Sequence, residues 1–198
     1  MGQELEFKLA VADEAQLSVI LSDRAIAALC GPWKETIMKT TYYDTPSRAL
    51  SARRWMLRCR SEGGTGVVCL KTPLEGRLRG EWEYPADGVD DSVLRALVRS
   101  GAPETLPALC AEGLIPVCGA AFLRRAAMLH FPDGSAAELA GDCGILRGSS
   151  QECPFAEIEL ELYEGAPGAA QALAEALCRR YGLHEEPLSK FARARQLR

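Results

Sequence analysis

The chain has 198 residues, of which 47% are hydrophobic and 25% charged, a composition typical of a globular protein. Its net charge of −4 provides no overall attraction for nucleic acid. No run of 18 apolar residues indicates a membrane helix, and the acidic N-terminus, which leads directly into a strand pattern, is unlike a secretory signal peptide. We therefore expect a cytoplasmic protein that binds neither nucleic acid nor a membrane, and the sequence implies no partner protein.

The first half of the chain predicts one helical stretch followed by a series of strands. Residues 3–11 alternate charged and apolar side chains, as a strand does. Asp13 and Gln16 are spaced like a capping box, so a helical stretch is expected to begin there and to end before Gly31. A strand then runs to Tyr42–Pro46, where Asp44, Thr45 and Pro46 are interpreted as turn residues rather than catalytic ones. The segments 55–61, 66–72 and 78–84 are separated by turn residues and predict a meander of hairpins.

The second half predicts further strands between helices. Residues 91–113 contain two short helices interrupted by Gly101 and Pro103. Strands are expected at 115–130, 136–142 and 155–163, and helices at 168–181 and 188–196. The pattern predicts about eight strands with peripheral helices.

Carboxylates at every second position are the most informative local pattern. In Glu157-Ile158-Glu159-Leu160-Glu161, strand geometry places all three Glu side chains on one face. The start of the chain, with Glu4, Glu6 and Lys8, repeats this spacing. Neighbouring carboxylates in such a row lie about 7 Å apart and repel by roughly 2 kcal/mol at an effective dielectric constant near 20. An enclosed row of this kind therefore requires cations.

Other predicted strands carry mixed rows of acidic and basic side chains with apolar residues between them. These rows contain Arg58, Arg60, Lys71, Arg79, Glu81, Glu83, Arg124 and Asp142. One interpretation is the solvated face of an ordinary antiparallel sheet. The other is a charged face that lines a cavity while the apolar face packs outward against helices. The concentration of carboxylates and guanidinium groups favours the second.

The cysteines and histidines do not predict a catalytic or zinc site. The eight cysteines form no Cys-x-x-Cys pair, and His130 and His184 have no matching triad partners in the sequence. We interpret the cysteines as reduced core residues.

Several short motifs, in a fixed order over most of the chain, resemble those of the CYTH family of triphosphate tunnel metalloenzymes. They are Glu4-x-Glu6-x-Lys8, Tyr42–Pro46, Leu57–Arg60, Leu70-Lys71, Arg79–Glu83, Arg124, Asp142–Gly144, Glu157–Glu161 and Ser189–Arg193. The resemblance runs from Gln3 to about Arg195 and is greatest with the inorganic-triphosphatase-like bacterial branch. It implies a single CYTH domain over residues 1–198. The implied fold is α+β and mainly antiparallel β, an eight-stranded closed tunnel or barrel with a charged interior and peripheral helices.

The resemblance also implies a divalent metal, Mg²⁺ or Mn²⁺, held by the acidic strands. Such cations prefer oxygen ligands and complete their shell with water and substrate phosphates. The expected first ligands are Glu4, Glu6, Glu159 and Glu161. The candidates for a second metal or for positioning water are Glu157, Glu81, Glu83 and Asp142.

Basic side chains are expected to bind the phosphates of a small polyanionic substrate. The expected residues are Lys8, Arg58, Arg60, Lys71, Arg79, Arg124, Lys190 and Arg193. The implied reaction is hydrolysis of inorganic tripolyphosphate to pyrophosphate and phosphate by a metal-activated water. The expected catalytic residues are Glu4, Glu6, Lys8, Lys71, Glu159 and Glu161.

The sequence leaves three alternatives open. The same tunnel could hydrolyse a nucleoside or thiamine triphosphate, cyclise a nucleotide, or bind polyphosphate without catalysis. Phe7, Trp55 and Trp82 alternate with the charged residues and are expected to face away from the ligand, which favours an inorganic substrate. Phe122 and Phe155 have the same parity as the charged residues and are the counter-argument.

Overall fold

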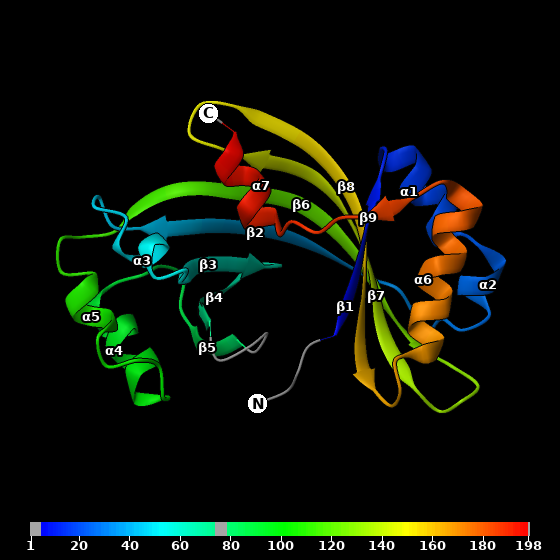
Figure 1. Ribbon diagram of the computed structural model, residues 1–198, viewed down its shortest axis with the longest axis horizontal. Coiled ribbons are helices and arrows are strands. Elements are labelled where there is room, and N and C mark those ends of the chain that lie inside the picture. Colours follow the sequence, from blue (N-terminus) through cyan, green and yellow to red (C-terminus); the bar gives the residue numbers. More distant parts are fainter. Residues whose placement is uncertain (1–4, 74–78, 198) are drawn as a thin grey trace.

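One strongly curved antiparallel sheet dominates the computed structural model, which describes residues 5–73 and 79–197 (Figure 1). Its nine described strands are β1 (Glu6–Val11), β2 (Lys34–Asp44), β3 (Met56–Glu62), β4 (Thr65–Pro73), β5 (Arg79–Pro85), β6 (Ile115–His130), β7 (Ala136–Arg147), β8 (Glu152–Glu164) and β9 (His184–Glu185). Their order across the sheet is β5-β4-β3-β2-β6-β7-β8-β1-β9. The predicted α+β class with a mainly antiparallel sheet is confirmed.

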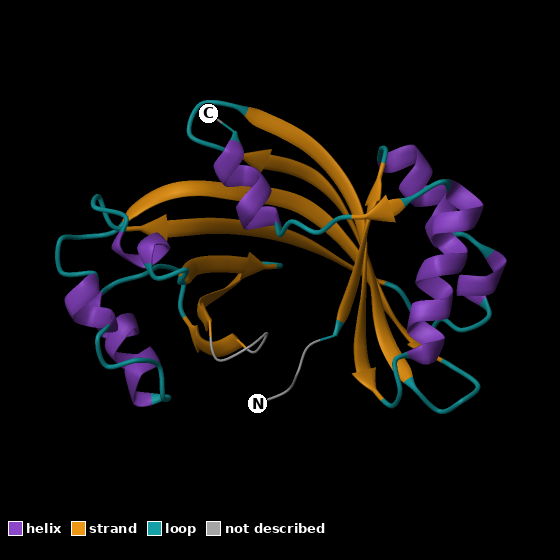
Figure 2. Cartoon of the chain, viewed as in Figure 1, coloured by secondary structure: helices purple, strands orange, loops and turns teal. Residues whose placement is uncertain are grey.

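The helices lie around this sheet in three places (Figure 2). They are α1 (Glu14–Leu21), α2 (Arg24–Ala27), α3 (Ala49–Ala52), α4 (Asp91–Arg99), α5 (Leu106–Leu109), α6 (Gly168–Tyr181) and α7 (Lys190–Gln196). Helices α1, α2 and α6 gather at one end of the sheet, α3, α4 and α5 at the other, and α7 crosses the middle. None of the described helices is long and apolar enough to cross a membrane.

The helical stretch predicted from Asp13 is divided into α1 and α2. Asp13 caps α1, because its carboxylate accepts a hydrogen bond from the Gln16 N–H at 2.8 Å. The side chain of Asp23 accepts the Ala25 N–H at 2.7 Å and begins α2. A second cap in the middle of an apolar stretch therefore ends one helix and starts another.

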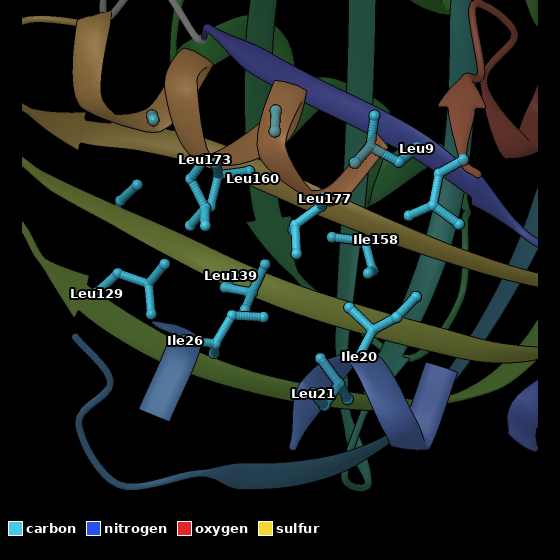
Figure 3. Packing of buried hydrophobic residues seen from close by; sticks show 14 of the residues in the cluster. Leu9, Ile20, Leu21, Ile26, Leu129, Leu139, Ile158, Leu160, Leu173 and Leu177 are labelled. Carbon is cyan, nitrogen blue, oxygen red and sulfur yellow. The ribbon is translucent and has the colours of Figure 1, made fainter. Parts of the chain in front are cut away.

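The largest apolar core lies between the sheet and helices α1, α2 and α6 (Figure 3). Leu9, Ile158 and Leu160 of β1 and β8 pack there against Ile20 and other apolar residues of the helices. Burying such a side chain stabilises the fold by about 1.5–3 kcal/mol. A second core packs Leu57, Val68 and Leu70 of β3 and β4 against α4 and α5. The expectation that the apolar face of the sheet packs outward against helices is thus confirmed.

The prediction of a closed eight-stranded barrel is wrong for the described residues. The sheet has nine strands, and β5 and β9 stand at its two ends. Closure would require the free edge of β1 to pair with β5, but β9 pairs with that edge through Leu9 and Ala10. The backbone N–H of Glu186 also donates to the Lys8 carbonyl at 2.9 Å. A short segment after α6 thus covers the edge of β1 in place of β5.

Candidate active site

Strand register places most of the predicted site residues on one face of the sheet. Residues that stand opposite each other on paired strands share a face. Glu6 pairs with Glu161, Lys8 with Glu159, and Asp142 with both Glu157 and Arg124. We call this surface the charged face; it comprises Glu6, Lys8, Arg58, Arg60, Lys71, Glu81, Glu83, Arg124, Asp142, Glu157, Glu159 and Glu161, with Lys190 and Arg193 of α7 directed onto it.

Three carboxylates surround the ammonium group of Lys190. Lys190 Nζ lies 2.7 Å from Asp142 Oδ2 and 2.8 Å from Glu159 Oε1, and it also contacts Glu157. The side chains of Asp142 and Glu157 are fully buried, and that of Lys190 is 11% exposed. Charges buried this deeply are stable only when they are paired and hydrogen-bonded.

Two guanidinium groups complete this cluster. Arg124 donates two hydrogen bonds to Asp142, at 2.8 and 2.7 Å, and one to Glu159 at 2.5 Å. Arg193 contacts the other oxygen of Glu157. The fork of Arg124 therefore holds Asp142 in a bidentate pair of fixed geometry.

These contacts determine which groups carry charge. Burial opposes ionisation of Glu159, but the charges of Lys190 and Arg124 outweigh burial and hold its pKa well below the usual value. Burial likewise opposes the charge of Lys190, but Glu159 and Asp142 outweigh it and raise the Lys190 pKa. Glu159 and Lys190 are therefore both ionised at neutral pH.

The β1 end of the charged face is more open and has excess negative charge. Lys8 Nζ lies 3.4 Å from Glu6 and 3.8 Å from Glu159. Burial and the nearby charge of Glu159 raise the pKa of Glu6 above its usual value. Glu161 stands opposite Glu6 and is exposed, and the predicted ligand Glu4 lies outside the described residues. A divalent cation here would relieve the repulsion that raises the Glu6 pKa.

The other end of the charged face, on β3 to β5, holds a second set of predicted residues. Lys71 Nζ lies 2.8 Å from Glu81, and Arg60 lies 3.8 Å from Glu83. Hydrogen bonding and charge from Lys71 outweigh burial and lower the Glu81 pKa. The strand position of Arg79 is described, but its side chain lies outside the described residues.

Three guanidinium N–H groups on the charged face are buried without an acceptor. Among the described residues, the Nε atoms of Arg58, Arg60 and Arg193 are the buried side-chain nitrogens or oxygens that lack a hydrogen-bond partner. A buried unsatisfied donor costs about 1–3 kcal/mol and calls for an explanation. Oxygen atoms of an anionic ligand would supply the missing acceptors.

Two further residues, Cys69 and Tyr42, stand opposite Arg58 on neighbouring strands and were not predicted as part of the site. Cys69 Sγ lies 3.2 Å from Glu81, and burial is the largest influence that raises the Cys69 pKa to about 12. Tyr42 is 4% exposed, and its ring centroid lies 4.8 Å from that of Phe191. Cys69 lies two residues before Lys71 on the same strand, so the alternation of the sequence already placed the two side chains on one face. Tyr42 pairs with Arg58 of β3 in regular register, so it has the same parity as the basic residues of that strand.

The aromatic residues divide as their parity predicted. Phe7 packs against the core beneath α1 and α6, and Trp55 and Trp82 pack against the core beneath α4 and α5. In contrast, Phe122 and Phe155 lie beside the charged cluster, where Lys190 Nζ is 5.0 Å and 5.6 Å from their ring centroids. Both rings contribute cation–π contacts to the Lys190 ammonium.

Two groups of the described residues have donor atoms close enough to hold a metal ion. One is Asp142, Glu157 and Glu159, and the other is Cys69, Glu81 and Glu83; within each group the donor atoms lie within 4.8 Å of one another. The first group offers three carboxylate oxygens, the donors that Mg²⁺ and Mn²⁺ prefer. The Lys190 ammonium group already occupies this position as a cation. The three carboxylates therefore suit a positively charged ligand, and their oxygens suit a hard metal ion.

A cavity of about 1250 Å³ lies elsewhere, beside β2, β6 and the end of α7. Its lining includes Arg195 and Asp44 but none of the predicted site residues. Asp44 accepts hydrogen bonds from the backbone N–H groups of Thr45 and Leu50, at 2.8 and 3.0 Å, and thereby shapes the turn into α3. This agrees with the interpretation of Asp44, Thr45 and Pro46 as turn residues.

A comparison with protein families agrees with this geometry. The CYTH domain model matches residues 2–194. The chain belongs to the CYTH domain family. This CYTH chain is 29% identical over 169 residues to an inorganic triphosphatase from Haemophilus influenzae. The match covers 83% of the chain but 46% of that relative, so the chain spans less than half of the relative's length.

Solved structures share the fold at low sequence identity. A putative adenylyl cyclase from Hippeastrum, described as having a dominant triphosphatase activity, superposes with a TM-score of 0.63 at 18% identity, covering 96% of this chain and 94% of that one. A protein from Pyrococcus horikoshii OT3 superposes with a TM-score of 0.55 at 18% identity, covering 96% and 97%. These similarities establish the fold alone.

Proposed function

We propose that the charged face binds inorganic tripolyphosphate with Mg²⁺ or Mn²⁺ and hydrolyses it to pyrophosphate and phosphate. The observation that carries this proposal is the set of buried, unpartnered guanidinium donors on Arg58, Arg60 and Arg193, which share a face with the carboxylate groups. A linear triphosphate carries several anionic oxygens along its length and matches donors spread over such a face. The inorganic triphosphatase relative supports the same chemistry.

The basic residues would grip and orient the phosphate chain. Arg58, Arg60 and Arg193 each have an Nε donor without an acceptor. The basic residues that pair with carboxylates would share their charge between those carboxylates and the substrate; they are Lys8, Arg60, Lys71, Arg124, Lys190 and Arg193. Arg79 belongs to this set by its strand position. Fixed cations of this kind stabilise the charge that spreads over a transferring phosphoryl group.

The acidic residues would hold the metal. Glu6, Glu159 and Glu161, with Glu4, are the proposed first ligands, and the groups around Asp142 and Glu157 and around Glu81 and Glu83 are the proposed second sites. A bound divalent ion supplies Lewis-acid stabilisation of the phosphates and makes a nearby water more acidic. Of the described residues, Lys8, Lys71, Glu6, Glu159 and Glu161 are the proposed catalytic ones.

A nucleoside or thiamine triphosphate is the alternative substrate, and the reaction on it would be hydrolysis or cyclisation. The aromatic residues that face outward could not stack on a base, which favours the inorganic substrate. Phe122 and Phe155 favour the alternative, but their rings are already in contact with Lys190 and Arg193.

A phosphate-release assay tests the proposal. Tripolyphosphate, pyrophosphate, ATP and thiamine triphosphate are compared in Mg²⁺, in Mn²⁺ and in chelator. We expect tripolyphosphate to give the highest kcat/KM, and chelator to abolish turnover. Glu159→Gln is expected to reduce the rate by about a hundredfold or more. Glu164→Gln, at an exposed position near the end of the same strand, is the matched control and should leave it unchanged.

Two results would contradict parts of the proposal separately. Undiminished activity in chelator would exclude the metal. A kcat/KM for ATP or thiamine triphosphate equal to that for tripolyphosphate would exclude the inorganic substrate while leaving the metal site in place.

A further inference from the structure

The position of the Lys190 ammonium raises the question of how a metal ion could enter the same cluster. Its nitrogen contacts one oxygen from each of Asp142, Glu157 and Glu159. Those are the three residues whose oxygens are close enough to one another to hold a metal ion. The side chain thus occupies the centre of the cluster rather than its rim.

A metal ion and this ammonium group cannot share the centre. Mg²⁺ binds carboxylate oxygens at about 2.0–2.1 Å and demands near-octahedral geometry, which leaves no room for a second cation among the same oxygens. The remaining oxygens of the cluster are also engaged, since Arg124 bonds to Asp142 and Glu159 and Arg193 contacts Glu157. The fully buried Asp142 and Glu157 cannot turn to solvent to offer other lone pairs.

The side chain of Lys190 can leave without unfolding the helix that carries it. Helix α7 is held independently by the ring contact of Phe191 with Tyr42, by the fully buried Ala194, and by Ser189, whose hydroxyl accepts the Ala192 N–H. Lys has a flexible four-carbon stem with a compact charge, whereas the planar guanidinium group of Arg193 has a fixed fork. Lys190 is therefore the member of the cluster suited to move.

We propose that Lys190 is a built-in competitor for the metal: a divalent ion enters the Asp142–Glu157–Glu159 cluster by displacing the Lys190 ammonium, which then becomes available to the phosphate chain. This inference rests on the proposed function and extends it: binding of the metal releases Lys190, and the released Lys190 then contacts the phosphate chain. No covalent bond is formed or broken in the exchange: the ion pairs of the ammonium give way to bonds between the carboxylate oxygens and the metal. A divalent ion carries one positive charge more than the ammonium it replaces, and the anionic phosphate chain would offset that charge.

The exchange makes an unusual prediction, namely that removing a predicted substrate ligand tightens metal binding. Mn²⁺ affinity is measured by titration calorimetry in phosphate-free, mildly alkaline buffer, for the wild-type chain, Lys190→Met and Lys34→Met. The Lys34→Met variant is the matched control, because it makes the same substitution at an exposed position of β2, outside both groups of candidate metal ligands. Since a neighbouring charge alters ionic equilibria by about tenfold or more, we expect Lys190→Met to bind Mn²⁺ at least about tenfold more tightly than wild type and clearly more tightly than Lys34→Met.

If Lys190→Met folds poorly without metal, thermal melting provides a second measurement of its metal binding. The variant should melt at a lower temperature than wild type in chelator, and a given Mn²⁺ concentration should raise its melting temperature by more than that of wild type, because stabilisation by a ligand grows with its affinity. Mn²⁺ affinity in Lys190→Met equal to or weaker than that of Lys34→Met would overturn the exchange. Since no phosphate is present, this outcome is independent of whether the chain hydrolyses tripolyphosphate.

Discussion

Arg124 and Lys71 lie at different ends of the charged face and hold different carboxylates. Arg124 pairs with Asp142 and Glu159, and Lys71 pairs with Glu81. If both also contact phosphate, replacing either by Met should raise the KM or dissociation constant for tripolyphosphate about tenfold or more, since a charge-assisted contact contributes roughly 1.5–3 kcal/mol. Arg95→Met, at an exposed position on α4, is the control. Unchanged kinetics in both variants would show that these residues do not contact phosphate and serve only as structural ion pairs.

Cys69 is expected to be chemically inert although it lies among site residues. Burial raises the pKa of its thiol to about 12, so almost none is thiolate near neutral pH. Iodoacetamide should therefore modify Cys153, which is half-buried, well before Cys69 in the native protein. Mass spectrometry of the alkylated peptides measures this order, and equal labelling of the two cysteines would contradict it.

Strand parity predicted which side chains share the charged face, but their pairing could not be read from the sequence. Alternation assigned Glu157, Glu159 and Glu161 to one face because the strand period is two. That Lys190 would contact Glu157 and Glu159 depends on where a helix more than 25 residues later crosses the sheet. No local pattern encodes this placement.

At the level of elements, Asp23 joins two helices that are distant in the sequence. Its carboxylate caps α2 and accepts hydrogen bonds from Tyr181 at 2.6 Å and Arg180 at 2.5 Å, at the end of α6. The bond from Tyr181 is the largest influence, and together these contacts lower the Asp23 pKa to about 2. The ionised form of Asp23 therefore stabilises the native state.

Asp23→Asn should lower the free energy of unfolding by about 1–2 kcal/mol at neutral pH. A carboxyl group whose pKa is lower in the folded state stabilises the protein above its unfolded pKa, and this contribution is lost as the pH falls toward the folded value. The difference between wild type and variant should thus shrink as the pH falls from about 4 toward about 2. Urea unfolding over this range measures it, and a difference that does not vary with pH would contradict the assignment.

Helices and strands with a clear periodic pattern of apolar residues were predicted correctly. The strands around Leu57 and Leu70 and the helix from 168 to 181 match β3, β4 and α6. β7 continues to Arg147, five residues beyond the predicted end at Asp142, because it pairs with β8 as far as Glu152. β9 has two residues and no periodicity, so only its pairing with β1 reveals it.

At the level of the whole molecule, the charged face should make stability depend on ligand. Tripolyphosphate with Ca²⁺, a metal chosen to limit turnover, would satisfy the buried donors and pair the carboxylates. At a ligand concentration about 100-fold above the dissociation constant, linkage predicts about 2.7 kcal/mol of added stability. The melting temperature should rise accordingly, and sulfate at matched ionic strength is the control. An unchanged melting temperature would argue against a polyanion site.

Whether the sheet closes could not be predicted from the sequence, because closure depends on which strand pairs with the free edge of β1. A tunnel and an open curved sheet have the same alternating strands and the same outward apolar face. The difference lies in whether β5 or β9 pairs with β1, and this is settled by where the chain returns after α6.

The pairing of β1 with β8 sets an order of assembly. Residues 6–11 leave the ribosome well before their partners at 156–161, which follow about 150 residues later. At a synthesis rate of about 5–20 residues per second, β1 waits roughly 8–30 s for its neighbour. During that interval Leu9 lacks its partner Ile158 on β8, and Glu6 remains apart from Glu159 and Glu161. Completion of the β1 end of the charged face therefore waits for β8, and Lys190 of α7 joins later still. A ligand that bridges these elements cannot guide the earlier steps of folding.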